Sequence, residues 1–223
     1  MKKVLSVSLT VILGIAVFLF IITFSIGLPI YCRFFYYAQI NPLNIPESTG
    51  YDFATIKTAY DQVLDYLTLP NRTFGAGVFK FTEEGASHFA DCKILFDLNA
   101  TVLIISTVIV VTLLILEKFN VIKLCRPFGC SVALISAFSI FVVAIILALF
   151  IAIDFESAFI TFHHLFFPGK DNWTFHPDYD EIITALPQEF FASCAVLIGA
   201  SIILISAGII IFQLVKRRKR LDK

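Results

Sequence analysis

Histidine side chains are the residues of this sequence best suited to acid–base chemistry, because an imidazole titrates near neutral pH. His88 opens the pattern His88-x-x-Asp91-x-Lys93. On a helix, Asp91 would lie one turn beyond His88, where a carboxylate can accept a proton from one ring nitrogen and fix the orientation of the imidazole. The pattern is therefore a candidate catalytic site. The alternative interpretation is a solvated helix face.

A second candidate, His163, lies in a segment rich in aromatic residues. The segment contains Phe162, Phe166, Phe167, Trp173 and Phe175. Aromatic neighbours partly desolvate an imidazole, which lowers its pKa and keeps it neutral and basic at physiological pH. Acyl transfer to an amine or an alcohol requires such a neutral base. A hydrogen-bonded packing role is the alternative for any single histidine of this kind.

Two other kinds of chemistry have weaker support. A zinc site could combine two or three histidines with an aspartate, but the adjacent pair His163-His164 lacks the i, i+4 spacing of zinc proteases and the HExxH motif is absent. Neither Ser87 nor Ser157 lies in the G-x-S-x-G context of a serine nucleophile. We therefore expect no metal site and no serine nucleophile.

Four apolar segments are long enough to position these residues at a membrane. Hydrophobic residues make up 58% of the 223 residues and charged residues 15%, and the mean hydropathy is +0.88. A transmembrane helix needs about 20 apolar residues. The segments that meet this length are 4–31, 98–116, 131–153 and 190–214. We predict an all-α integral membrane protein with four transmembrane helices in a single membrane domain, residues 1–223.

The charged residues predict the orientation of these helices. Of the 17 Lys and Arg residues, 11 lie in the two terminal segments and in 117–130, whereas 15 of the 17 Asp and Glu residues lie in 32–97 and 154–189. Cationic flanks are retained in the cytoplasm. Both termini are therefore expected in the cytoplasm of a plasma-membrane protein, and 32–97 and 154–189 are expected to be extracellular. All four histidines fall in these two acidic segments. The strong negative charge of the segments makes nucleic acid an unsuitable partner.

The predicted extracellular segments contain their own helical signals. Apolar residues recur at helical spacing over 52–69, which indicates an amphipathic helix. Thr82 precedes two glutamates and is a suitable N-cap for a helix that could continue into the second span. The aromatic content of 154–189 places that segment at the membrane interface. Cys32 and Cys92 could pair, although the five cysteines form no clear disulfide pattern.

Several short patterns together resemble a known family. They are His88-x-x-Asp91-x-Lys93, Phe162-His163-x-x-Phe166-Phe167, Trp173-x-Phe175 and Pro187-x-x-Phe190-Phe191. With the four-span layout, they resemble the lipoprotein intramolecular transacylase family, small integral membrane proteins of low-GC Gram-positive bacteria. His164 and His176 depart from the pattern, and we do not expect them to be catalytic.

The resemblance implies a specific reaction. The sn-2 acyl chain of a diacylglyceryl-modified lipoprotein would move to the α-amine of its N-terminal cysteine, giving a lyso-form lipoprotein without any cofactor. The resemblance implies His88 and His163 as the catalytic pair, with Asp91 as an orienting group and Lys93 as a contact for a lipid headgroup or the oxyanion. Lipoprotein substrate and membrane lipids are the expected partners, and the active site is expected on the extracellular face.

Three other functions remain open from the residues alone. A four-span scaffold would have the same span count, but a loop with paired cysteines is absent. A transporter accessory protein is also compatible, although no apolar segment carries the interior charge that marks an ion path. Another lipid acyltransferase or hydrolase could use the same two histidines.

Overall fold

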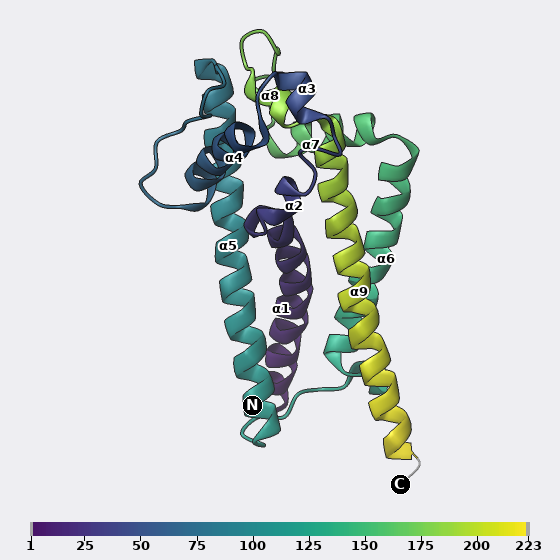
Figure 1. Ribbon diagram of the computed structural model, residues 1–223. Helices are drawn as coiled ribbons and strands as arrows, with labels where there is room; N and C mark the ends of the chain where they lie inside the picture. Colours follow the sequence, from purple (N-terminus) through teal and green to yellow (C-terminus); the bar gives the residue numbers. More distant parts are fainter. Residues whose placement is uncertain (1, 222–223) are drawn as a thin grey trace. The chain divides into compact units, whose positions relative to one another are not determined.

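The computed structural model describes the backbone of residues 2–221, and this part of the chain is helical with no strand (Figure 1). The long helices are α1 (Lys2–Tyr31), α5 (Glu83–Lys118), α6 (Val132–Ile153) and α9 (Gln188–Leu221). The shorter ones are α2 (Phe34–Tyr37), α3 (Ile45–Thr49), α4 (Phe53–Thr68), the 3-10 helix η1 (Pro127–Gly129), α7 (Phe155–Phe166) and α8 (Ile182–Ala185). The predicted all-α fold class is confirmed.

Each of the long helices is apolar and long enough to cross a membrane. They correspond to the four segments predicted from the sequence, with α6 beginning one residue after the predicted start at 131, so the prediction of four transmembrane helices is confirmed. The helix α5 extends well beyond the predicted span 98–116, because residues 83–97 continue it without a break. Thr82 directly precedes α5, as its capping chemistry indicated. His88 therefore lies on the same continuous helix as the second apolar segment.

The chain divides into two compact units. Unit 1 consists of Met1–Ile26, Ala100–Leu149 and Ile198–Lys223. Unit 2 consists of Gly27–Asn99 and Phe150–Leu197. Both candidate histidines belong to unit 2.

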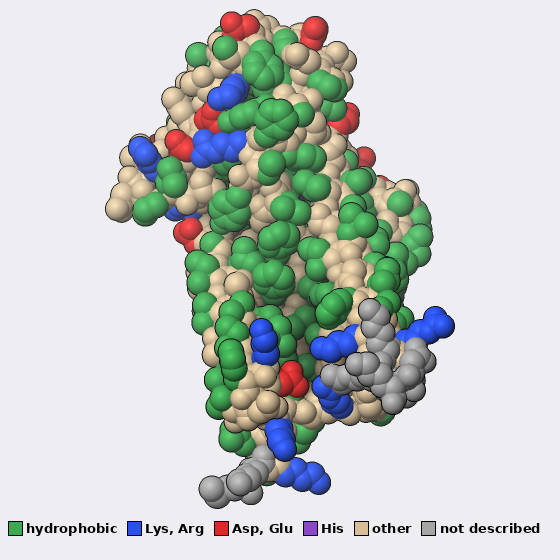
Figure 2. All heavy atoms as spheres, turned by 60° about the horizontal axis from the view of Figure 1, so that its bottom comes forward, with side chains coloured by type: hydrophobic (Ala, Val, Ile, Leu, Met, Phe, Trp, Pro, Cys, Tyr) green, Lys and Arg blue, Asp and Glu red, His purple; other side chains and the backbone are tan. Residues whose placement is uncertain are grey.

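Small residues allow close helix packing in unit 1. An added Cβ at Gly14 of α1 would lie 2.7 Å from Cγ2 of Val132, and the Ser136 hydroxyl donates to the Gly14 carbonyl over 2.8 Å. Such close approach stabilises helix pairs in lipid, where apolar burial supplies little driving force. Figure 2 shows hydrophobic side chains over the outer surface of these helices and Lys and Arg side chains gathered near one end. This pattern is typical of a membrane-embedded bundle.

Aromatic stacking forms the centre of unit 2. Tyr36 of α2 and Tyr60 of α4 stack with ring centroids 3.8 Å apart, and Phe190 of α9 packs edge-on against Tyr36 at 5.0 Å. The Tyr36 hydroxyl donates to the Ala185 carbonyl over 2.6 Å, which satisfies the polar end of a fully buried ring. The amphipathic helix predicted at 52–69 is confirmed as α4, whose apolar face is buried in this core.

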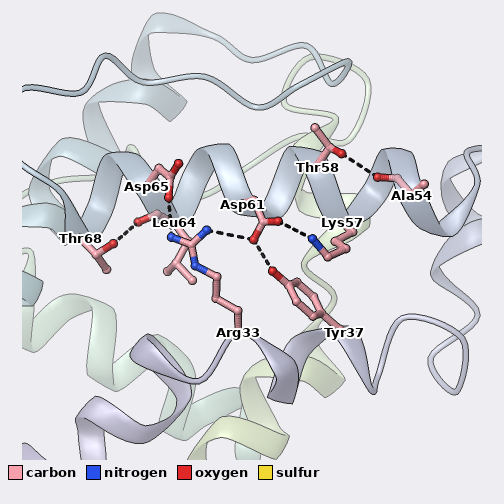
Figure 3. A network of polar contacts seen from close by, with 9 residues as sticks. All are labelled: Arg33, Tyr37, Ala54, Lys57, Thr58, Asp61, Leu64, Asp65 and Thr68. Atoms are coloured by element: carbon pink, nitrogen blue, oxygen red, sulfur yellow. Dashed lines mark hydrogen bonds and ion pairs between the residues drawn. The ribbon is translucent and has the colours of Figure 1, made fainter.

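An ionic network attaches the polar face of α4 to Arg33, which directly precedes α2, and to Tyr37 at the end of α2 (Figure 3). Arg33 donates to Asp61 over 3.0 Å and also to Asp65. The Asp61 carboxylate additionally accepts from Lys57 over 2.8 Å and from the Tyr37 hydroxyl. A network of partly buried charges stabilises more than isolated surface ion pairs do, because the side chains are already ordered by one another. It therefore fixes one side of α4 while the aromatic core fixes the other.

Gly77 provides a test of this packing. Its φ is +61°, and an added Cβ would lie 2.8 Å from the Cβ of Ala59 in α4. Gly50 is the matched control, because its φ is +73° and a Cβ there would meet nothing within 4 Å. We expect Gly50→Ala to cost about 1 kcal/mol for the left-handed backbone alone, and Gly77→Ala to cost at least about 1 kcal/mol more through overpacking. Thermal unfolding in detergent measures both, and equal losses would contradict close packing of Gly77 on α4.

Candidate active site

A hydrogen-bonded cap fixes the start of α5. The Thr82 hydroxyl accepts from the Gly85 amide over 2.9 Å, as an N-cap does. Oδ1 of Asp180 in turn accepts from the Thr82 amide at 2.8 Å and from the Thr82 hydroxyl at 2.9 Å. An added Cβ at Gly85 would lie 2.3 Å from this oxygen, so only glycine permits the approach. The loop before α8 is thereby held against the turn that leads to His88.

The helix α7 carries the second histidine. Its start is capped by Asp154, which accepts from the Ser157 amide over 3.0 Å. The predicted interfacial segment thus contains a regular helix, and His163 lies in its last turn. The side chain faces inward, since His163 is buried within unit 2.

The two candidate histidines meet in unit 2. The ring centroids of His88 and His163 are 5.8 Å apart, with an interplanar angle of 33°. Only 5% of His88 and 7% of His163 is exposed. The ring of Phe167 contacts both, with centroid distances of 4.9 Å to His88 and 5.8 Å to His163. At this separation the two imidazoles can act on one bound substrate.

The contacts of His163 define its proton-accepting atom. Nδ1 lies 2.7 Å from the Phe159 carbonyl, and because a carbonyl only accepts, Nδ1 carries the proton. The lone pair of the neutral ring is therefore on Nε2. The ring also contacts two aromatic rings. Trp173 stacks on it with ring centroids 4.6 Å apart, and the centroid of Phe159 lies 4.2 Å away.

Burial keeps His163 neutral. Desolvation lowers the pKa of His163 below its usual 6.5, against an opposing effect of the hydrogen bond to Phe159, and the nearby His164 lowers it further. The neutral form of a general base is thus available at neutral pH. This is the environment that the aromatic residues of the segment predicted.

His88 has different hydrogen-bond surroundings. Its Nε2 lies 3.3 Å from Sγ of Cys92, one turn further along α5. Its Nδ1 is buried and has no hydrogen-bond partner among the described residues. Phe175 packs edge-on against the ring with centroids 5.5 Å apart. If the thiol donates to Nε2, the neutral ring carries its proton on Nδ1, which can then donate to a substrate oxygen.

Asp91 contacts the loop that carries Trp173. Its carboxylate accepts from Nζ of Lys170 at 2.5 Å and from Nδ2 of Asn172 at 3.0 Å. Nε1 of Trp173 donates to the Lys170 carbonyl over 2.9 Å, which closes the loop on itself. A charged donor binds a carboxylate more strongly than a neutral imidazole does, so Lys170 takes this position. Asp91 thereby holds the ring that stacks on His163.

Lys93 points to α4. Its ammonium donates to the carbonyls of Tyr66 at 2.8 Å and Leu69 at 3.1 Å, where the end of the helix leaves carbonyl groups without intrahelical partners. The structure therefore groups His88, His163 and Asp91 with the loop, and gives Lys93 contacts at the end of α4.

The aromatic residues named from the sequence divide into two groups. Phe167, Trp173 and Phe175 contact the imidazoles. Phe162 packs edge-on against His163 at 5.4 Å and is followed by Phe166, but these two rings are 46% and 47% exposed. The first group encloses the pair, and the second forms an open apolar face of α7.

Four residues that contact the site were not identified from the sequence. Phe159 and Cys92 lie at i−4 and i+4 from a histidine, so helical spacing could have indicated both. Lys170 and Asn172 gave no such signal, because their contacts with Asp91 cross about 80 positions of the sequence.

Neither a disulfide nor a metal-binding cluster is found among the described residues. All five cysteines are free thiols, so Cys32 and Cys92 do not pair. Among the described residues, no group of three or more His, Cys, Asp or Glu side chains could hold a metal ion.

Comparison with known proteins gives a consistent match. The family model for the lipoprotein intramolecular transacylase Lit matches residues 11–191, which include both histidines. The fold resembles the in meso structure of the membrane integral lipoprotein intramolecular transacylase Lit from Bacillus cereus, with a TM-score of 0.84, 27% identity, and 96% of each chain covered.

Two further solved structures of the Bacillus cereus protein carry a substituted histidine. The arginine variant has a TM-score of 0.75 and 25% identity, covering 96% of this chain and 93% of that one. The alanine variant has a TM-score of 0.75 and 26% identity, covering 95% and 94%. No curated protein sequence matches the chain. The fold and the family model together show that this chain belongs to the lipoprotein intramolecular transacylase family of membrane-integral acyltransferases.

Proposed function

We propose that the chain moves the sn-2 acyl chain of a diacylglyceryl-cysteine to the α-amine of the same cysteine, with His88 and His163 as the catalytic pair. The observation that carries this assignment is the buried contact of the two imidazoles, 5.8 Å apart, within the part of the chain that matches the family. Family membership argues against a scaffold or a transporter accessory protein. The enclosed aromatic surroundings favour transfer over hydrolysis, because they exclude water from the reacting ester.

The proposed step needs one proton acceptor and one proton donor. The amine nitrogen attacks the carbonyl carbon of the sn-2 ester, forming a C–N bond, and the C–O bond to the glyceryl oxygen then breaks. One proton leaves the nitrogen and one reaches the glyceryl oxygen, so protons balance without a cofactor. Donor and acceptor belong to one molecule, and the task of the site is to hold the flexible glyceryl arm in a reactive conformation.

The hydrogen bonds of the two rings support an assignment of roles. His163 has its Nδ1 proton engaged by the Phe159 carbonyl, which leaves Nε2 as the base that receives the amine proton. His88, beside the Cys92 thiol, is suited to donate a hydrogen bond from Nδ1 to the oxyanion. The imidazolium of His163 then gives the proton that it received to the departing glyceryl oxygen, so both rings end neutral. Burial lowers the pKa of both rings, that of His88 to about 4, so the resting pair is neutral at pH 7.

Removal of either imidazole should strongly reduce the rate of product formation. We expect His88→Ala and His163→Ala each to lower the rate about 10²- to 10⁴-fold, the usual contribution of general acid–base catalysis. The assay is mass spectrometry of N-terminal lipopeptides from a bacterium that makes only diacylglyceryl lipoproteins. The control is His176→Ala, since His176 is exposed and contacts Tyr179 rather than the pair.

These variants are expected to fold. The Bacillus cereus relative with a histidine replaced by alanine still matches this fold with a TM-score of 0.75. Full activity in either variant would refute the catalytic pair. Release of free fatty acid by the wild-type protein, without N-acyl product, would instead identify a hydrolase.

The pKa of His163 can be tested directly. Because burial lowers this pKa below 6.5, the ring should be neutral at pH 7 and should bind a proton only as the pH falls further. Loss of the neutral base then removes catalysis at acidic pH. NMR titration of carbon-13-labelled histidines, with His163→Gln to assign the signal, measures the midpoint. A midpoint at or above 6.5 would contradict the desolvated environment.

The charge distribution supports an extracellular position for unit 2 in the plasma membrane. Segments 32–97 and 154–189 contain 15 of the 17 acidic residues, and 11 of the 17 basic residues lie elsewhere. With four spans, both termini would then lie in the cytoplasm. An extracellular site would meet lipoproteins in the outer leaflet, among membrane lipids.

Cysteine labelling tests this orientation. Cys32 is exposed and lies in unit 2, whereas Cys130 lies between α5 and α6 in unit 1. In variants that keep one of these thiols, a membrane-impermeant maleimide should label Cys32 in intact cells and Cys130 only after permeabilisation. The reverse pattern would invert the proposed topology.

A further inference from the structure

Of the two polar atoms in the side-chain amide of Asn172, Nδ2 is hydrogen-bonded and Oδ1 is not. Nδ2 donates to Oδ2 of Asp91 over 3.0 Å, and because the carboxylate is already an acceptor for Lys170, this contact assigns the nitrogen to that side. Oδ1 is buried and has no hydrogen-bond partner among the described residues. Burying an acceptor without a donor costs about 1–3 kcal/mol, so such an atom calls for an explanation.

The side chain of Asn172 is held between two neighbours that adjoin the catalytic pair, Asp91 through its hydrogen bond and Trp173 through the chain. Asp91, which binds the amide, lies one helical turn from His88 on α5. Trp173, the next residue of the chain, stacks on His163 with centroids 4.6 Å apart. Its indole also donates to the Lys170 carbonyl, which limits the movement of the loop. The oxygen is thus a fixed acceptor on the loop whose Trp173 and Phe175 rings contact His163 and His88.

The substrate offers few donors to such an acceptor. Both glyceryl oxygens of a diacylglyceryl-cysteine are esterified, and the thioether sulfur carries no hydrogen. The α-amine is the hydrogen-bond donor next to the reacting ester. It keeps an N–H bond even after one proton has left for His163.

From this chemistry we infer that Oδ1 of Asn172 accepts a hydrogen bond from the α-amine of the substrate cysteine. This hydrogen bond directs the lone pair of the amine nitrogen toward the sn-2 ester. The inference rests on the proposed transacylase function and adds a positioning residue to it. Asp91 acts through Asn172, since its carboxylate orients the amide. The site would in this way favour substrates with a free amine.

Binding of two lipopeptides tests the inference. One is an S-diacylglyceryl-cysteine peptide, and the other is its des-amino analogue, in which hydrogen replaces the α-amine. Both are titrated into protein carrying His163→Ala, which does not consume the substrate. We expect the free amine to bind roughly tenfold more tightly than the analogue, as one hydrogen bond to an otherwise unsatisfied acceptor provides. Adding Asn172→Ala should reduce this preference to about one.

Lys170→Ala is the matched control. It removes the other contact of the loop with Asp91 but leaves the Asn172 amide in place, so the preference for the amine should persist. Unchanged affinity for the des-amino analogue in Asn172→Ala reports that the loop is still folded. A preference retained in Asn172→Ala, or equal binding of both lipopeptides before that change, overturns the inference. The transacylase function is judged separately, by whether wild-type protein converts the free-amine peptide to its lyso-form.

Discussion

Two carboxylates connect the loop after α7 to the first turns of α5, and the geometry of the imidazole pair depends on them. Asp180 binds the capping residue Thr82, and Asp91 binds Lys170 and Asn172. Between these two attachments the chain carries the aromatic rings that cover the pair. Asp180 accepts two hydrogen bonds from Thr82, and Asp91 accepts one from the Lys170 ammonium and one from the Asn172 amide. Hydrogen bonds to an ionised carboxylate are stronger than those between neutral groups. These attachments add to the ring contacts that join His88 of α5 to His163 of α7.

Desolvation gives this arrangement its chemical character. Rings on several elements surround the two imidazoles, so solvent cannot stabilise a positive charge on them. The same enclosure strengthens any hydrogen bond made to the developing oxyanion, because the local dielectric is low. The polar atoms that face inward are few, and each has a defined donor or acceptor character. A flexible lipid substrate can therefore be oriented by a small number of contacts within an apolar enclosure.

Features with a local cause could be predicted from the sequence. Apolar length predicted the four spans, helical spacing predicted α4, and the capping chemistry of Thr82 predicted the start of α5. The histidines were proposed from short motifs, and their meeting depended on the fold.

Features with a long-range cause could not be predicted. The partner of Asp91 was expected on its own helix, but the cation that binds it comes from a loop distant in the sequence. The stack of Tyr36 on Tyr60 is also a long-range contact, because the sequence around neither tyrosine indicates which residue it will contact. Contacts of this kind are set by tertiary packing, which composition and periodicity do not encode.

Because α5 is one unbroken helix, it fixes the distance between His88 and the second apolar span. Ten residues separate His88 from the start of the predicted apolar span, which corresponds to about 15 Å along the helix axis. A helix of this kind does not shorten, so on the proposed topology the distance of His88 from the hydrocarbon would depend on where the apolar span lies in the bilayer. Bilayer thickness and headgroup packing would then govern how far an acyl ester must be lifted toward the site. On the proposed topology, lipid composition would then affect how readily the reaction proceeds.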